Sequence, residues 1–145
     1  MHSSIEEFIG TYPNCCESNR VVKENGKRFE IESSESFTKI KIDNCVIVSH
    51  ETEKCDYGIH RISNDDFYFI ELKGKGIQKG YDQLVTTINY FQQHLVNIPK
   101  NKRIGIIVSS KVPGGTDVNN LKQDFAKKYG KILEIKNKDL RCPPK

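Results

Sequence analysis

The stretch FYFIELKGKG, residues 67–76, decides the fold, because it joins a strand fit for burial to charges at its end. Its first residues are aromatic or aliphatic, the types that favour β-strands. Side chains alternate across a strand, so Glu71 and Lys73 share one face while Leu72 points to the other. Buried charges cost desolvation free energy unless they pair or take part in chemistry. The stretch therefore predicts a buried strand that ends in a candidate functional site.

Helical spacing follows this strand. Apolar residues recur at helical intervals over 77–96, which predicts an amphipathic helix that stops before Pro99. The run RIGIIVS (103–109) is nearly continuous in apolar residues, as is typical of a central strand covered on both faces. A strand, a helix and a strand of this kind predict a right-handed βαβ crossover.

The segments before this unit predict antiparallel strands. The polar segment 14–27 is expected to form turns. The expected strands after it are 28–32, 37–42, 45–48 (or a continuation of the strand before it), 56–62 and 67–73. The first two read as a hairpin, and the last two as another around the polar loop 63–66.

A short helix is predicted near the N-terminus, over 4–10. Ser3 or Ser4 can cap it, since Glu6 and Glu7 each stand three residues after a serine, as in a capping box.

The C-terminal part predicts one more helix and one more strand. Thr116 or Asp117 can cap the helix and Gly130 can end it, after which 131–136 reads as an edge strand before a loose tail. The whole pattern predicts a single α/β domain over 1–145, with a mixed β-sheet flanked by helices.

Composition places the chain among ordinary globular proteins. It is 145 residues long, 36% hydrophobic and 29% charged, with a net charge of +4. This mild basic bias is compatible with a polyanionic partner but is far from that of a dedicated nucleic-acid coat. No apolar run approaches the roughly 20 residues that span a bilayer. The acidic start MHSSIEEFIG lacks the layout of a signal peptide, so a cytoplasmic protein without membrane contact is expected.

The five cysteines form an odd set without CxxC spacing: Cys15, Cys16, Cys45, Cys55 and Cys142. Neither a disulfide framework nor a zinc ribbon is therefore indicated. Cys15, Cys16, His50 and Cys55 can be imagined as a metal site, but small buried or surface thiols are the favoured interpretation.

The second predicted hairpin brings charged residues together. If 63–66 form the loop, Asp56 faces Lys73, and Gly58 faces Glu71 and leaves open space beside it. The two carboxylates are then diagonal neighbours about 7–8 Å apart. A one-residue slip of the register would separate them, because it moves every side chain to the other face.

Such a cluster has the parts for hydrolysing a phosphodiester. Asp56 and Glu71 can share a hard cation such as Mg²⁺, with Mn²⁺ as a substitute and the carbonyl of Leu72 as a further ligand. Lys73 can orient a water and stabilise charge at phosphorus, while the metal lowers the pKa of that water. The competing interpretation is an exposed cross-strand ion pair, worth about 0.2–1 kcal/mol.

The run CDYGIHRISNDDFYFIELKGKGIQKGYDQL, residues 55–84, carries a family resemblance. Its Asp, followed fifteen residues later by E-x-K and then by a helix, resembles the core of the PD-(D/E)XK nuclease superfamily, in the style of its small bacterial members. The resemblance implies a restriction-endonuclease-like mixed sheet flanked by helices. It also implies that Asp56 and Glu71 bind Mg²⁺ and that Lys73 assists the attacking water.

Three further positions bear on this resemblance. Cys55 stands where the family usually has a proline. Members often place a glutamine on the helix after the lysine strand, and Gln83 fits that place, although an ordinary solvated glutamine fits equally well. Many members add a glutamate from the first helix, which Glu6 or Glu7 would supply here, but helix capping is the favoured role for both.

The function that these features predict is a Mg²⁺-dependent nuclease, with DNA favoured over RNA as its substrate. The resemblance also implies a homodimer, because small nucleases of this kind often gain binding surface by pairing. The alternative is a non-catalytic protein of the same fold that binds or regulates a partner, for example in a defence or toxin system. No motif of the chain indicates a separate module that reads nucleic-acid sequence.

Overall fold

The computed structural model describes residues 1–49, 53–72, 76–110, 116–137 and 139–144. Its α-helices are α1 (Ile5–Thr11), α2 (Ile77–Tyr90) and α3 (Thr116–Lys128). Its strands are β1 (Cys16–Ser18), β2 (Val21–Glu24), β3 (Lys27–Ile31), β4 (Phe37–Lys41), β5 (Tyr57–Arg61), β6 (Phe67–Glu71), β7 (Arg103–Ser109), β8 (Ile132–Asn137) and β9 (Asp139–Cys142). No helix in these ranges has the length and apolar character needed to cross a membrane.

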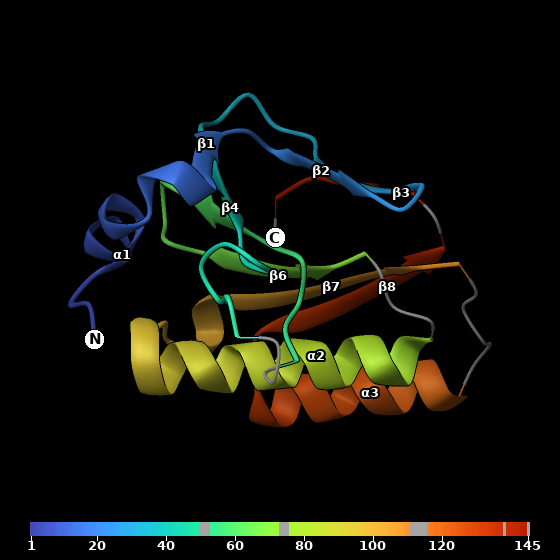
Figure 1. Cartoon of the computed structure of the whole chain (residues 1–145). Coiled ribbons are helices and arrows are strands. Elements are labelled where there is room, and N and C mark those ends of the chain that lie inside the picture. Colours follow the sequence, from blue (N-terminus) through green and yellow to red (C-terminus); the bar gives the residue numbers. More distant parts are fainter. Residues whose placement is uncertain (50–52, 73–75, 111–115, 138, 145) are drawn as a thin grey trace.

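The strands in the described part of the chain form two sheets of different size. The larger has six strands in the order β1-β4-β5-β6-β7-β8, and the smaller has three in the order β2-β3-β9. Strands β6, β7 and β8 run parallel, whereas the pairings from β1 to β6 are antiparallel. Helices α2 and α3 lie side by side along one face of the large sheet, and β2 and β3 lie over the other (Figure 1). The predicted mixed α/β fold is confirmed, as is the β6–α2–β7 crossover between parallel strands.

Alternate side chains of β6 enter two apolar layers. Phe67 and Phe69 contact Phe91 beside the helices, with ring centroids 5.6 and 5.2 Å apart. Tyr68 points to the small sheet, where its ring lies 6.0 Å from that of Phe29. Every residue of β6 is buried, which explains why its sequence is almost continuously apolar. The glutamate that ends the strand is therefore held inside the protein.

Several predicted elements are confirmed with small shifts of their ends. Ser4 caps α1, and its hydroxyl accepts a hydrogen bond from the amide of Glu7 at 3.1 Å. The predicted helix over 77–96 is α2, followed by one π-helical turn over Phe91–Leu95. Strand β8 lies at the edge of the large sheet, as expected for its position after the last helix.

The prediction that 28–32 and 37–42 pair as a hairpin is wrong. Strand β3 pairs with β2 and β9, while β4 pairs with β1 and β5. The turn between β2 and β3 is Asn25-Gly26, with φ of 52° and 74°, the left-handed backbone of a two-residue hairpin turn. The segment 14–27, expected to be turns, thus contains two strands.

Two further predictions are wrong at the level of secondary structure. Residues 45–48 do not form a strand; the chain makes a tight turn in which the amide of Ile47 donates to the carbonyl of Ile42 at 3.0 Å. The C-terminal tail is not loose, because β9 pairs in parallel with β3. In both cases tertiary contacts decide the backbone, which local pattern alone does not reveal.

The interpretation of all five cysteines as thiols is also wrong. Cys15 and Cys45 form a disulfide with their Cα atoms 5.8 Å apart. Cys16, Cys55 and Cys142 keep their thiol groups. The imagined metal site loses Cys15 as a ligand for this reason, and His50 lies outside the described residues.

Candidate functional site

The β5–β6 hairpin has a register two residues away from the predicted one. Gly58 was expected to face Glu71, but it faces Phe69. The difference arises in the connection, which spans four residues as predicted but starts one residue earlier, at 62–65 instead of 63–66. The amide of Arg61 donates to the carbonyl of Asp66 at 2.9 Å, so the turn closes across these two residues.

Hydrogen bonds at the end of the hairpin keep the two carboxylates near each other. Tyr57 pairs with Ile70, and the amide of Asp56 also donates to the carbonyl of Ile70, at 3.1 Å. The Asp56 carboxylate accepts from the amide of Leu72, the residue after Glu71, so it lies beside the end of β6. A shift by two residues keeps every side chain on its face, so the predicted convergence survives the error. Asp56 and Glu71 are called the carboxylate pair below.

The predicted pairing of Asp56 with Lys73 is wrong, because the Asp56 backbone pairs at Ile70. Lys73 itself lies outside the described residues. Leu72 points away from the carboxylate pair into the apolar layer beneath the small sheet, as strand alternation predicted.

Both carboxylates are buried. The exposed fraction is 1% for Asp56 and 0% for Glu71. The amide of Leu72 donates to Oδ2 of Asp56 at 2.6 Å, so this carboxylate also fixes the backbone just beyond β6. Leu72 was predicted to contribute its carbonyl to a metal; the hydrogen bond from its amide fixes the Glu71–Leu72 peptide, which precedes that carbonyl. The metal-binding role of the carbonyl stays a prediction.

The space around the carboxylate pair differs from the prediction. No open space lies beside Gly58, because a Cβ there would stand 2.6 Å from the ring of Phe67. The close approach is instead at Gly80 of α2, where a Cβ would lie 3.4 Å from Cγ of Glu71 and 3.3 Å from Cγ2 of Ile107. Helix α2 thus packs directly against the stem of Glu71.

The flank of α2 that carries Gln83 faces the strand leading to the carboxylate pair. Thr87, one turn further along, accepts a hydrogen bond from the amide of Cys55 at 2.8 Å and donates to the carbonyl of Gln83 at 2.7 Å. Gln83 is half-buried, and its Oε1 has no hydrogen-bond partner among the described residues. The catalytic role of Gln83 stays a prediction.

The pKa of the Cys55 thiol depends on burial and on the charges at this end of the hairpin. Complete burial raises the pKa of its thiol well above the ordinary value, and the negative charges of Glu71 and Asp56 raise it further. The thiol is therefore neutral and unreactive, and it packs as a small apolar group. Both carboxylates lie close enough for their charges to act on the same buried sulfur.

The turn that carries the disulfide holds the backbone of Asp56. The amides of Ile42 and Asp43 both donate to the carbonyl of Asp56, at 3.1 and 3.3 Å. Cys45, two residues further along, is bonded to Cys15. This covalent anchor therefore supports the carboxylate pair through the backbone.

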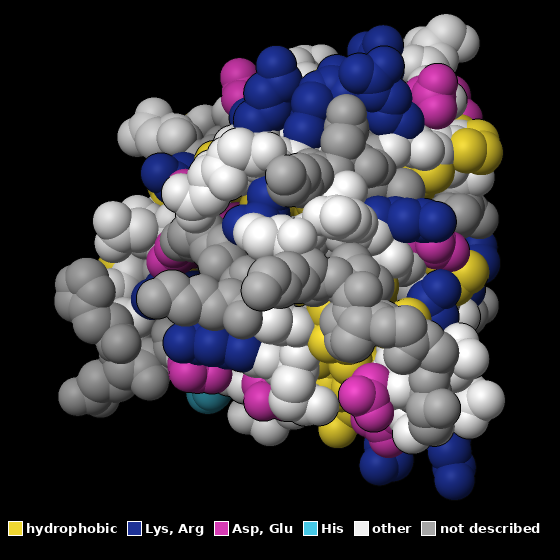
Figure 2. Space-filling model, turned by 90° about the vertical axis from the view of Figure 1, so that its right-hand side faces the viewer, with side chains coloured by type: hydrophobic (Ala, Val, Ile, Leu, Met, Phe, Trp, Pro, Cys, Tyr) yellow, Lys and Arg dark blue, Asp and Glu magenta, His cyan; other side chains and the backbone are white. Residues whose placement is uncertain are grey.

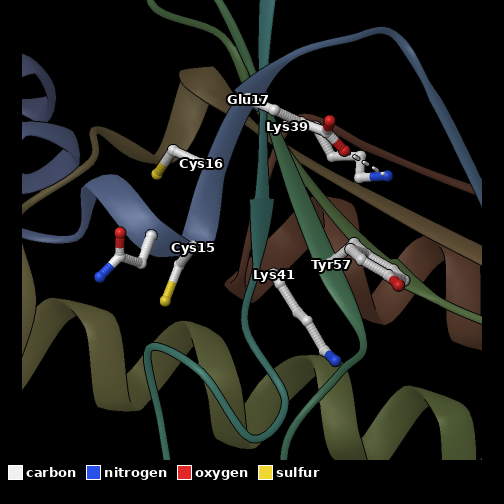
Figure 3. A pocket seen from close by; sticks show the side chains of 7 residues that line it. Cys15, Cys16, Glu17, Lys39, Lys41 and Tyr57 are labelled. Atoms are coloured by element: carbon white, nitrogen blue, oxygen red, sulfur yellow. Dashed lines mark ion pairs between the residues drawn. The ribbon is translucent and has the colours of Figure 1, made fainter.

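A hollow of about 310 Å³ lies beside this anchor. Figure 3 shows Cys15 and Cys16 on one side of it and Lys41 and Tyr57 on the other. Lys39 forms an ion pair of 2.9 Å with Glu17, and its ammonium group lies 5.2 Å from the centre of the Tyr57 ring. The hollow thus combines cations with an aromatic face.

A second, adjoining hollow is lined by more cations. Lys23, Arg28 and Lys39 line it together with Asn19 and Val21. Lys and Arg side chains gather at the top of the view in Figure 2, at the height of β2 and β3 in Figure 1. Lys23, Arg28 and Lys39 are called the basic hollow below.

Neither glutamate of α1 joins the carboxylate pair. The amide of Glu7 donates to the capping hydroxyl of Ser4, as the capping box implied, while its carboxylate accepts from the hydroxyl of Ser3 and pairs with His2 at 3.5 Å. Glu6 lies next to His60 and Asp65, at the turn end of the hairpin. Four residues of strand separate His60 from Asp56, a span of about 13 Å. Sequence reasoning missed this second cluster, because the spacing of Glu6 from the hairpin carries no local signal.

The basic KNKR segment (100–103) has structural roles. Arg103 donates to the carbonyls of Ile98 and Tyr129 at 2.7 and 3.0 Å. Lys100 donates to the carbonyl of Ala126 at 2.9 Å. These cations tie the loop before β7 to α3 and its C-terminal end.

No family model, curated protein or solved structure matches this chain.

Proposed function

We propose that the protein is a Mg²⁺-dependent nuclease of the PD-(D/E)XK kind, acting on DNA in preference to RNA. The observation that carries this proposal is the carboxylate pair: Asp56 and Glu71 are buried, and Asp56 accepts a hydrogen bond from the amide of Leu72, the residue after Glu71. Mn²⁺ would substitute for Mg²⁺ at the same ligands.

The donor set fits a hard divalent cation. Two like charges near each other raise each other's energy, and burial adds to that cost. A cation bound between them offsets both terms, and carboxylate and carbonyl oxygens are the ligands that Mg²⁺ prefers. Asp56 has a second oxygen, Oδ1, besides the one that accepts from Leu72, whose carbonyl would complete the protein ligands. Mg²⁺ bound there supplies Lewis acidity toward a phosphoryl oxygen and a bound water.

Two side chains would complete the site. Lys73, two residues beyond Glu71, would orient the attacking water and offset charge on the phosphorus centre. Gln83 would hold a phosphate oxygen or the water from the flank of α2, where its Oε1 is buried.

The fold supports the same family. A mixed sheet carries the acidic residues on neighbouring antiparallel strands, and a helix packs back across the second of them before a parallel strand. We propose that this is a restriction-endonuclease-like core with an added helix and strands. A homodimer is part of the proposal, since one 145-residue chain offers little surface for a duplex.

The basic hollow supports a nucleic-acid substrate. Phosphate contacts from Lys and Arg supply most of the sequence-independent affinity for nucleic acids. Figure 2 views the side of the molecule where β6 ends and α2 begins, and its basic side chains gather on that same side.

A non-catalytic binding protein of the same fold is the second candidate. Its supporting observation is the hydrogen bond from Leu72 to Asp56, together with the burial of both carboxylates. Carboxylates that hold backbone in place serve folding as well as chemistry. Such a protein would keep the basic hollow and bind nucleic acid or a partner without cutting.

Cleavage assays separate these candidates. Plasmid, linear duplex, single-stranded DNA and RNA would be incubated with Mg²⁺, Mn²⁺ or EDTA. Asp56→Asn and Lys73→Ala would be compared with Asp82→Asn, which removes an exposed carboxylate of α2. The nuclease predicts metal-dependent cleavage that falls by roughly 10²-fold or more in the first two variants and stays unchanged in the third. Binding without cleavage under every condition would favour the second candidate.

A further inference from the structure

A second group of metal-ligating side chains lies at the turn end of the β5–β6 hairpin. Glu6 of α1, His60 of β5 and Asp65 of the turn each offer one ligand atom, and these atoms lie within 4.8 Å of one another. We propose that this histidine cluster binds a transition-metal dication of the zinc type, separate from the carboxylate pair.

The geometry is set by the buried histidine. His60 is 2% exposed, and its Nε2 lies 2.8 Å from Oδ1 of Asp65. Its Nδ1 has no hydrogen-bond partner among the described residues, so the polar contact recorded for the ring points into the cluster. Packing between the large sheet and the helices thus aims one ring nitrogen at two carboxylates.

The two carboxylates approach from different elements. Asp65 has a φ of 65°, a left-handed conformation that folds the turn back toward His60. Glu6 projects from the first turn of α1. Both are exposed, so their side chains can contract from 4.8 Å to the roughly 3.3 Å that separates ligands around tetrahedral zinc.

The charge balance of the cluster favours a cation. Within the described ranges, no Lys or Arg side chain forms a recorded ion pair with Glu6 or Asp65. Two carboxylates beside one imidazole therefore repel each other without a basic side chain to offset them. A bound dication supplies that offset and leaves water as its fourth ligand.

The ligand types select the metal. Imidazole nitrogen suits Zn²⁺, Co²⁺ and Ni²⁺, whereas Mg²⁺ and Ca²⁺ prefer oxygen alone. The histidine cluster and the carboxylate pair would thus prefer different metals. Binding would tie α1 to the hairpin, since Glu6 and His60 are far apart in sequence.

Co²⁺ is the direct probe, because its visible absorption reports coordination geometry and imidazole ligation. Metal-free protein would be titrated with Co²⁺ and then with Zn²⁺ as competitor. The test variants are Glu6→Gln and Asp65→Asn, both at exposed positions where folding is retained. Asp56→Asn removes the other proposed metal site, and Asp82→Asn is the matched control for charge. His2→Gln covers the neighbouring His2–Glu7 pair.

The proposal predicts one tetrahedral Co²⁺ per chain, displaced by Zn²⁺ and kept in Asp56→Asn, Asp82→Asn and His2→Gln. Affinity should fall by at least about tenfold in Glu6→Gln and Asp65→Asn, since even outer-shell substitutions cost that much. Co²⁺ affinity that is unchanged in those two variants would overturn it. An absence of tetrahedral bands in the wild type would do so too, and would leave the His60–Asp65 hydrogen bond as a structural contact. Neither result touches the nuclease proposal, because the carboxylate pair is assayed separately by cleavage.

Discussion

The two ends of the β5–β6 hairpin handle acidic side chains in opposite ways. At the strand end, Asp56 and Glu71 are buried beneath α2 and held by a backbone amide. At the turn end, Glu6 and Asp65 are exposed, and only His60 between them is buried. The same hairpin thus carries two groups of acidic side chains about 13 Å apart, one with carboxylate oxygens alone and one with an added imidazole nitrogen.

The difference lies in what fixes each site. The carboxylate pair is held by strand pairing, by α2 and by a disulfide-anchored turn, so it is pre-organised. The histidine cluster depends on one buried ring and two side chains that are free to rotate. Substitutions near the strand end should therefore change stability and metal binding together, whereas those near the turn end should change one or the other.

Loss of the disulfide should have the largest effect on stability. The bond closes a loop of 30 residues, and its removal in Cys15→Ser/Cys45→Ser should lower the free energy of unfolding by about 3–4 kcal/mol. Mn²⁺ affinity at the carboxylate pair should fall as well, because Cys45 lies in the turn that holds Asp56. Urea unfolding and calorimetry measure the two effects. Cys16→Ser, which removes a neighbouring free thiol, should leave both unchanged. Equal stability of all three proteins would contradict this role.

Gly58→Ala should disturb the packing in the middle of the hairpin, between its two ends. The added Cβ would stand 2.6 Å from the Phe67 ring, which is packed against Phe69 and Phe91 and cannot move freely. The expected loss is about 1–3 kcal/mol, measured by urea unfolding. A second substitution, Phe67→Leu, removes the ring that the new methyl group meets. The double variant should therefore cost less than the sum of the two single ones, and strict additivity would argue against this contact.

Gly80→Ala should change the geometry of the carboxylate pair while changing the free energy of unfolding little. Alanine favours the helix by up to about 1 kcal/mol, while the new Cβ presses on Glu71 and Ile107 at 3.3–3.4 Å. Stability should change little, but Mn²⁺ binding at the carboxylate pair should weaken as Glu71 shifts. Gly10→Ala in α1 is the matched control, since a Cβ there meets nothing within 4 Å. If Gly80→Ala binds Mn²⁺ as tightly as Gly10→Ala does, the helix does not position the glutamate.

The smallest effect on stability is expected on acidification, through a carboxylate at the turn end of the hairpin. Hydrogen bonds from Arg61 and Ser63 lower the pKa of Glu35 from 4.5 to about 2. Because the folded protein holds this carboxyl pKa below its unfolded value, the ionised group stabilises the fold at pH values above 4.5. That contribution is lost as pH falls from 4.5 toward about 2. Glu35→Gln should therefore show a shallower loss of stability in this window, by urea unfolding at stepped pH. Glu32→Gln, a nearby exposed carboxylate, should follow the wild type.

The spacing of hydrophobic residues along the sequence predicted the elements that are long and buried. Three sequence patterns each reflect one dominant environment, and each matches an observed element. They are the apolar strand pattern in 67–72, the helical spacing from 77 and the apolar run 103–109. One local signal was missed: Asn25-Gly26 between short apolar–polar segments is a strong mark of a two-residue hairpin.

Other features had no local signal at all. The position of the loop at 62–65 goes with a left-handed conformation of Asp65, which few sequences require. The Cys15–Cys45 bond could not be deduced from an odd number of cysteines. Strand β9 forms because β3 offers it an edge. The carboxylate pair was found nonetheless, because a register error of two residues preserves the face of each side chain.

Mn²⁺ binding by calorimetry tests the contrast between the two ends most directly. Metal-free wild type would be compared with Asp56→Asn, Glu71→Gln and Asp65→Asn. We expect Mn²⁺ binding to be lost in the first two variants and kept in the third, because Asp56 and Glu71 supply the side-chain ligands of the proposed hard-cation site and Asp65 does not. Mn²⁺ affinity that is indifferent to Asp56→Asn and Glu71→Gln would contradict a metal site at the strand end, and with it the proposed nuclease.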